Sequence, residues 1–119
     1  MKKAYLIDPE KKEVTEVFFS GLDDIYRLTG CDCIDVARLS AGEGIYVDDN
    51  GLLKEPEFFF WISGFYPHPL AGRGLFVGPV DRDGYEKNPV TVIEDVRKNT
   101  VFLTAGQVGA FWHGCGGFE

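Results

Sequence analysis

The chain is poor in the residues from which catalytic and metal sites are most often built. It has 119 residues but only 2 histidines and 3 cysteines, and no serine or cysteine forms a recognisable pattern with a histidine base. It also lacks a glycine-rich phosphate loop followed by the Lys and Ser or Thr that such loops need. We therefore expect a protein without enzymatic activity and without a required cofactor.

Long apolar runs and positive charge are also scarce. No apolar stretch approaches the roughly 20 residues of a membrane span, and the N-terminus reaches Asp8 and Pro9 before a signal-peptide hydrophobic region could form. Twelve Lys and Arg stand against 19 Asp and Glu, a net charge of −7 that repels a phosphate backbone. These features predict a cytoplasmic, acidic protein that binds neither membrane nor nucleic acid directly.

The remaining composition is that of one small domain. The chain is 45% hydrophobic and 14% aromatic, which is enough for a single core without disulfides. The β-prone runs 3–7 and 13–19 flank a polar turn with Pro9 and predict an opening hairpin. Further strands are expected at 34–39, 45–47, 58–62, 75–77 and 101–103. Asn50-Gly51 is the strongest turn signal.

Two short helices are expected between these strands. The first follows the capping-box spacing of Ser20 and Asp23 and ends at Gly30, and the second follows the same spacing at Thr91 and Glu94. The sequence thus predicts a single α+β domain over residues 1–105. It is built on a mainly antiparallel twisted sheet of about five or six strands with both helices on one face. Residues 106–119 form a glycine-rich and aromatic tail, either flexible or packed as a flap.

The aromatic run at 58–62 places large side chains on both faces of any strand it forms. Such a strand is either central and covered on both faces or part of an interface. Core packing is the favoured interpretation, and a homodimer through this run is the alternative.

Four segments together resemble a known family. They are Leu22-Asp23-Asp24-Ile25-Tyr26, Ile34-Asp35-Val36, the run from Ile45 to Leu53, and Pro69-Leu70-Ala71-Gly72-Arg73-Gly74. They look like small uncharacterised proteins of phages, prophages and plasmids that carry a domain of unknown function, and the resemblance extends from Lys3 to Leu103. It implies a mobile-element origin. By analogy of context it also implies a protein that binds a host protein, with an anti-defence or nucleic-acid-mimic role.

One candidate ligand site surrounds Arg73. Gly72 and Gly74 could let backbone amides converge on a phosphate or carboxylate while Arg73 offers a bidentate fork. His68 on a stiff loop, with the aromatic rings of Trp61 and Tyr66, could complete a site for a nucleotide-like molecule. The alternative for the glycines is a tight turn that leads into the strand at 75–77.

A second candidate site is a zinc centre. Cys31, Cys33, His113 and Cys115 supply soft ligands, and His68 is a possible extra one. The one-residue gap in each pair is not the usual zinc-knuckle spacing. The alternative is a set of thiols with no metal, which an odd number of cysteines and the absence of an export signal also favour over disulfides.

Overall fold

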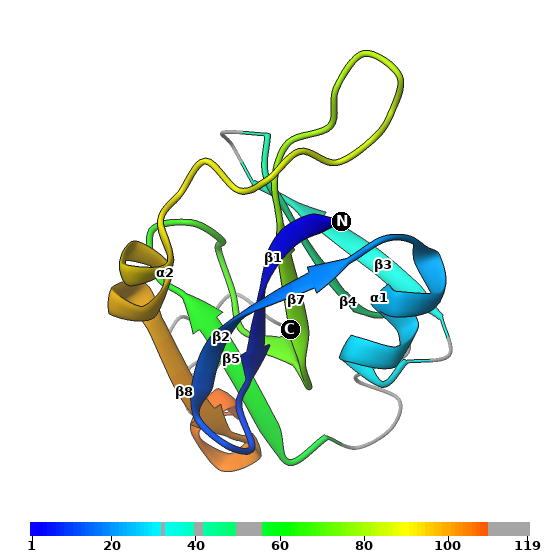
Figure 1. Cartoon of the computed structure of the whole chain (residues 1–119). Coiled ribbons are helices and arrows are strands. Elements are labelled where there is room, and N and C mark those ends of the chain that lie inside the picture. The colour runs from blue at the N-terminus through cyan, green and yellow to red at the C-terminus, as the bar shows by residue number, and fades with distance from the viewer. Residues whose placement is uncertain (32, 40–41, 50–55, 110–119) are drawn as a thin grey trace.

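The computed structural model describes residues 1–31, 33–39, 42–49 and 56–109, and it contains two antiparallel sheets (Figure 1). The larger sheet has the order β2-β1-β7-β4-β3. Its strands are β1 (Lys2–Asp8), β2 (Glu13–Phe19), β3 (Ile34–Arg38), β4 (Gly44–Asp48) and β7 (Gly74–Val77). The smaller sheet, in the order β6-β5-β8, contains β5 (Phe58–Ile62), β6 (Leu70–Ala71) and β8 (Thr100–Thr104).

Two helices complete the α+β fold. They are α1 (Leu22–Thr29) and α2 (Ile93–Asn99), and residues 105–109 add a further helical turn in which Val108 is buried. The predicted α+β class and the antiparallel pairing are confirmed. The opening hairpin is also confirmed, with Lys2 opposite Phe19 and Asp8 opposite Glu13. None of the described helices is long and apolar enough to cross a membrane.

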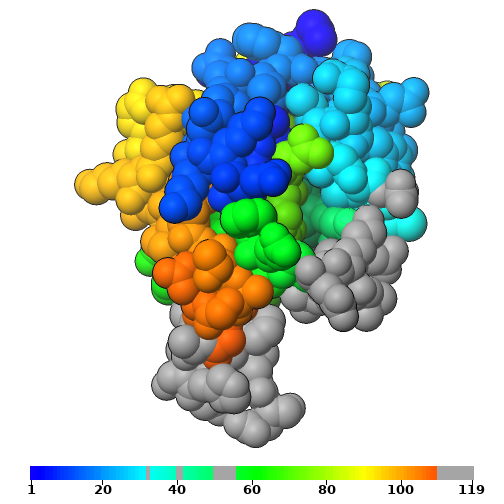
Figure 2. All heavy atoms as spheres, turned by 90° about the horizontal axis from the view of Figure 1, so that it is seen from below, coloured from blue at the N-terminus to red at the C-terminus, as the bar shows by residue number. Residues whose placement is uncertain are grey.

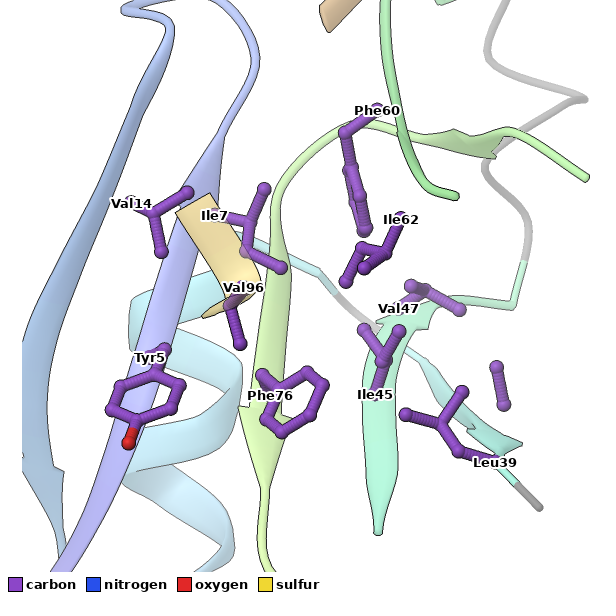
Figure 3. Packing of buried hydrophobic residues seen from close by; sticks show 11 residues of the cluster. Tyr5, Ile7, Val14, Leu39, Ile45, Val47, Phe60, Ile62, Phe76 and Val96 are labelled. Carbon is purple, nitrogen blue, oxygen red and sulfur yellow. The ribbon is translucent and has the colours of Figure 1, made fainter. Parts of the chain in front are cut away.

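The core lies on both faces of the larger sheet. On one face, Tyr5, Ile7, Ile45 and Phe76 pack against Phe60 and Ile62 of β5 and Val96 of α2, as Figure 3 shows for the labelled side chains. On the other face, Ala4, Leu75 and Val77 pack against Ile25 of α1. All four residues of the central strand β7 are buried because both of its faces are covered.

This arrangement corrects the expected layering. The strands divide into sheets of five and three instead of forming one sheet, and the helices lie on opposite faces of the larger sheet instead of one. Apolar side chains of β1 point to both faces of the larger sheet, so each face must be covered by another layer of the structure. Strand β6 (Leu70–Ala71) is also not among the strands expected from the sequence.

The aromatic run at 58–62 belongs to the core, which was the interpretation that the sequence favoured. Phe59, Phe60 and Ile62 are buried, whereas Phe58 and Trp61 are half-buried. The Phe60 ring packs so closely on Gly74 that a Cβ there would be 2.4 Å from Phe60 Cζ. A glycine at position 74 is therefore needed for the two sheets to meet.

The helix ends agree only partly with prediction. Gly30 does end α1, with φ of 70° and its N–H donating to Tyr26 O at 2.8 Å. At the start of α1, however, Asp24 rather than Asp23 accepts from the Ser20 backbone N–H, at 2.8 Å. The predicted capping box at Thr91 is wrong, because Val92 is the N-cap and the Thr91 hydroxyl donates to Glu43.

The predicted turn at Asn50-Gly51 and most of the tail lie outside the described residues. Of the tail, residues 106–109 are described, and they continue the helical turn that begins at residue 105.

Candidate functional site

A cavity of about 290 Å³ opens beside Arg73. It lies where the β1–β2 turn, the C-terminal end of α1, the end of β4, the start of β5 and the β6–β7 turn come together. Figure 2 shows the face on which the blue β1–β2 turn, the cyan end of α1 and the green residues of β5 lie near one another. Its volume is at the small end of the range for ligand pockets.

The end of α1 makes room for the Arg73 side chain. Gly30 adopts a left-handed conformation, and a Cβ at this position would lie 2.1 Å from Arg73 Nη2 and 3.2 Å from Arg73 Cζ. The guanidinium thus lies directly over Gly30, the residue that caps the C-terminal end of the helix. A cation is favoured there, since the last carbonyl groups of a helix carry partial negative charge.

The two glycines beside Arg73 do not form the predicted amide nest. Gly72 has φ of 73° in the β6–β7 turn, and its N–H donates to Phe58 O at 3.0 Å. Gly74 is buried in β7 against Phe60. The tight-turn alternative therefore describes these glycines, while the exposed Arg73 and its neighbour Gly72 border the cavity.

Most of the charge around the cavity is negative. Asp8, Glu10, Asp48 and Glu57 border it, and Arg73 is the only basic residue that does so among those the structure describes. Asp8 is fixed by its own turn, since its Oδ1 accepts from the backbone N–H of Glu10 at 3.1 Å and of Lys11 at 3.3 Å. The sequence had not associated these acidic residues with Arg73, because they come from three distant segments.

The other predicted ligand-binding residues gather elsewhere. Trp61 Nε1 donates to Tyr66 O at 2.8 Å, and the Tyr66 and His68 rings meet edge to face with centroids 4.9 Å apart. None of the three borders the cavity. They lie toward the Ile62 end of β5, whereas the cavity is at the Phe58 end, so the structure divides the predicted site into two groups.

The two described cysteines of the predicted zinc site lie in different surroundings. Cys31 is buried at the edge of the cavity, with its Sγ 3.6 Å from Thr29 O, whereas Cys33 is exposed. No group of three or more His, Cys, Asp or Glu suited to a metal ion occurs among the described residues. His113 and Cys115 lie outside those residues, so the zinc site stays a prediction.

The loop between β7 and α2, residues 78–92, is a second prominent feature and extends beyond the sheets (Figure 1). We call it the β7–α2 arm. Its base is fixed by Glu43, a carboxylate only 2% exposed, which accepts from Val90 N–H at 2.9 Å, Thr91 N–H at 3.0 Å and Thr91 Oγ1 at 2.6 Å. No pattern in the sequence indicates this role, because a Glu between two glycines looks like an ordinary turn residue.

Two tyrosines also hold the arm. Tyr5 Oη donates to Thr91 O at 2.7 Å, and Tyr46 Oη donates to the Glu86 carboxylate. Burial, together with the bond to Glu86, raises the pKa of Tyr46 to about 12. Burial and nearby carboxylates raise the pKa of Tyr5 as well. Both phenols are therefore held in their neutral, donating form.

The fold and the cavity define a small α+β domain with a pocket-like site beside Arg73. The chain belongs to the family described as Domain of unknown function (DUF3846), whose model matches residues 1–100. Membership of an uncharacterised family is thus confirmed, while the mobile-element origin stays a prediction.

One curated relative is described as an uncharacterised protein. The chain is 32% identical over 97 residues to "Uncharacterized protein y4iR" of Sinorhizobium fredii (strain NBRC 101917 / NGR234). The match covers 77% of this chain and 58% of the relative, so the chain spans little more than half the length of that protein. No solved structure gives a significant match.

Proposed function

We propose that this protein is a non-enzymatic binding domain that holds a small polar molecule in the cavity beside Arg73. The observation that carries this proposal is the meeting of Arg73, Gly30 and the acidic residues around one concave site. Concave sites with a few convergent polar groups are the usual places for small ligands. Proline, alanine and phenylalanine side chains from Pro9, Ala71 and Phe58 supply apolar contact surface in the same cavity.

Arg73 is suited to contact a ligand. It makes no ion pair or hydrogen bond within the part of the chain that the structure describes, although four carboxylates border the same cavity. An arginine fork that is not already engaged can bind a carboxylate or phosphate through two parallel hydrogen bonds.

Binding fits the cavity better than catalysis does. The one described histidine, His68, does not border it, and the hydroxyl of Thr29, which does, donates to Ile25 O at 2.7 Å. A hydroxyl that donates its proton to a helix carbonyl does not donate it to a base that would activate it as a nucleophile. We therefore propose recognition or sequestration of a ligand without chemical change.

Native mass spectrometry of the full chain purified from its own host tests this proposal. We expect a small-molecule adduct on the wild-type protein that is lost from Arg73→Ala and kept by Arg82→Ala. Arg82 is an exposed arginine of the β7–α2 arm, away from the cavity residues, and so serves as the matched control. An adduct that all three proteins retain equally would contradict a site at Arg73.

The β7–α2 arm favours a second function, binding of a host protein. It carries a set of exposed apolar side chains, namely Val80, Tyr85, Val90 and Val92, of which Val90 is 77% and Tyr85 65% exposed. An arm that is fixed at its base and carries exposed apolar residues suits insertion into a groove of another protein. This supports the binding of a host protein, and we propose a mobile-element accessory protein with an anti-defence role as the form it takes.

A photo-crosslinking amino acid at position 85 tests the second function in cells. We expect a crosslink to one host protein that is lost when Val90→Ser is added, with the melting temperature unchanged. The same crosslinker at Arg82 controls for position on the arm. If crosslinks form only to a second copy of the chain, the arm mediates self-association, and the proposal of a host partner is contradicted.

A further inference from the structure

The balance of charge around the cavity specifies the kind of small molecule it would hold. Among the described residues that border the cavity, the four carboxylates outnumber the one guanidinium, that of Arg73. A ligand with two or more negative charges, such as a nucleotide, would meet this excess of like charge. A ligand with net positive charge would be attracted. The low-dielectric walls of a cavity strengthen both the repulsion and the attraction.

Arg73 adds the requirement that the ligand also carries a negatively charged group. Its guanidinium lies over Gly30 at the end of α1 and is paired with none of the bordering carboxylates in the described part of the chain. A purely cationic ligand would be repelled by this group. A ligand that carries one carboxylate would bind it through two charge-assisted hydrogen bonds.

The acidic residues are placed to receive the other end of such a ligand. Asp8 is fixed in its turn by the backbone N–H groups of Glu10 and Lys11, so it presents a fixed negative charge on one wall. Glu57 borders the cavity from the residue before β5. Phe58 also borders the cavity and can contact an aliphatic chain.

We propose that the cavity binds a basic α-amino acid, a small molecule with one carboxylate and more than one cationic group. The carboxylate pairs with Arg73 and the cationic groups face the acidic residues. This inference rests on the proposed function, because it names the ligand class of the same cavity.

Isothermal titration calorimetry with L-arginine and agmatine tests it directly. Agmatine is arginine without the carboxylate, so the ratio of the two affinities isolates the contact with Arg73. We expect the wild-type chain to bind L-arginine at least tenfold more tightly than agmatine, about the effect of one charge-assisted pair. In Arg73→Gln this ratio falls to about one, because the positive charge that binds the carboxylate is gone.

A second variant keeps the test interpretable if Arg73→Gln does not fold. Gly30→Ala displaces the guanidinium without removing its charge, and it too should lower the ratio. Glu57→Gln is the complementary change. It should weaken L-arginine and agmatine to a similar extent, since both carry the cationic groups that the carboxylates bind.

L-Glutamate and inorganic phosphate, titrated in the same way, separate the two proposals. If either binds the wild-type chain more tightly than L-arginine, and does so through Arg73, the amino-acid inference is overturned and the cavity proposal stands. If none of the four probes binds, the inference is also overturned. The cavity proposal then depends on the Arg73-dependent adduct described above, and without that adduct both fail.

Discussion

The guanidinium of Arg73 lies over Gly30, with its Nη2 atom 2.1 Å from the place that a Cβ on residue 30 would take. The two residues are far apart in the sequence, but they meet because the β6–β7 turn lies against the C-terminal end of α1. Gly30 thus has two roles. It ends the helix in a left-handed conformation, and it leaves space for the Arg73 side chain at the cavity.

Gly30→Ala should affect both stability and binding. A Cβ at φ of 70° costs about 1–2 kcal/mol, and the same Cβ pushes the guanidinium out of its place. Gly64→Ala is the matched control, since Gly64 has φ of 82° with no atom within 4 Å of an added Cβ. We expect urea unfolding to show similar losses in both variants, with ligand affinity reduced only by Gly30→Ala. Equal affinities would mean that the guanidinium position does not matter.

Gly74→Ala should destabilise the core where the two sheets meet. The added Cβ would be 2.4 Å from Phe60 Cζ and 3.0 Å from Ile45 Cγ2, and both side chains are fully buried. Overpacking of this kind costs about 1–3 kcal/mol. Urea unfolding measures the loss. Gly106→Ala, where the nearest atom to an added Cβ is Thr104 Oγ1 at 4.0 Å and the residue is helical, should cause no loss of stability. A Gly74→Ala protein as stable as the wild type would refute the close sheet contact.

Glu43→Gln should loosen the base of the β7–α2 arm. The buried carboxylate accepts three hydrogen bonds from Val90 and Thr91, and an amide nitrogen in place of one oxygen cannot accept. We expect a loss of about 1–3 kcal/mol and faster hydrogen exchange at the Val90 and Thr91 amides. Glu94→Gln, which removes only an exposed pair with Arg97, should cost less than about 1 kcal/mol. Unchanged exchange at residues 90 and 91 would show that Glu43 does not hold the arm.

The raised pKa of Tyr46 predicts a loss of stability in alkali. Its folded pKa of about 12 lies above the ordinary value of 10.0, so the folded state favours the neutral phenol. The resulting stabilisation is complete below about pH 10 and is lost as the pH rises through about 12. We expect Tyr46→Phe to show a smaller decrease in stability over this range than the wild type. An absorbance titration in which every tyrosine ionises near pH 10.0 would contradict the raised pKa of Tyr46.

Local signals in the sequence predicted the elements of the fold well. The hairpin at residues 2–19, the helix ending at Gly30 and the strand at 58–62 follow from turn residues, a left-handed glycine and β-prone side chains. Their arrangement in space was less predictable. Whether Val92 to Val96 covers the same face as Ile25 depends on pairings between distant strands, and no local pattern specifies those pairings.

The candidate site was likewise predictable from the sequence only in part. Arg73 and Gly72 were identified from a glycine-rich turn, and both border the cavity. Their partners were not identified, because Gly30, Asp8 and Asp48 approach Arg73 only after the hairpin, α1 and β4 have packed. Conversely, His68 and Tyr66 are close to Arg73 in the sequence, but β5 and β6 carry them to a separate cluster.

The most direct test of the central claim is a ¹H–¹⁵N correlation spectrum of the full chain, titrated with L-arginine. Glycine amides report on the cavity from two sides, Gly30 at the end of α1 and Gly72 in the β6–β7 turn. Gly64 and Gly84, in loops that do not border the cavity, are internal controls. We predict saturable shifts at Gly30 and Gly72 with little change at Gly64 and Gly84, and loss of these shifts in Arg73→Gln. Shifts confined to the control glycines, or the same shifts in Arg73→Gln, would contradict a ligand site at Arg73.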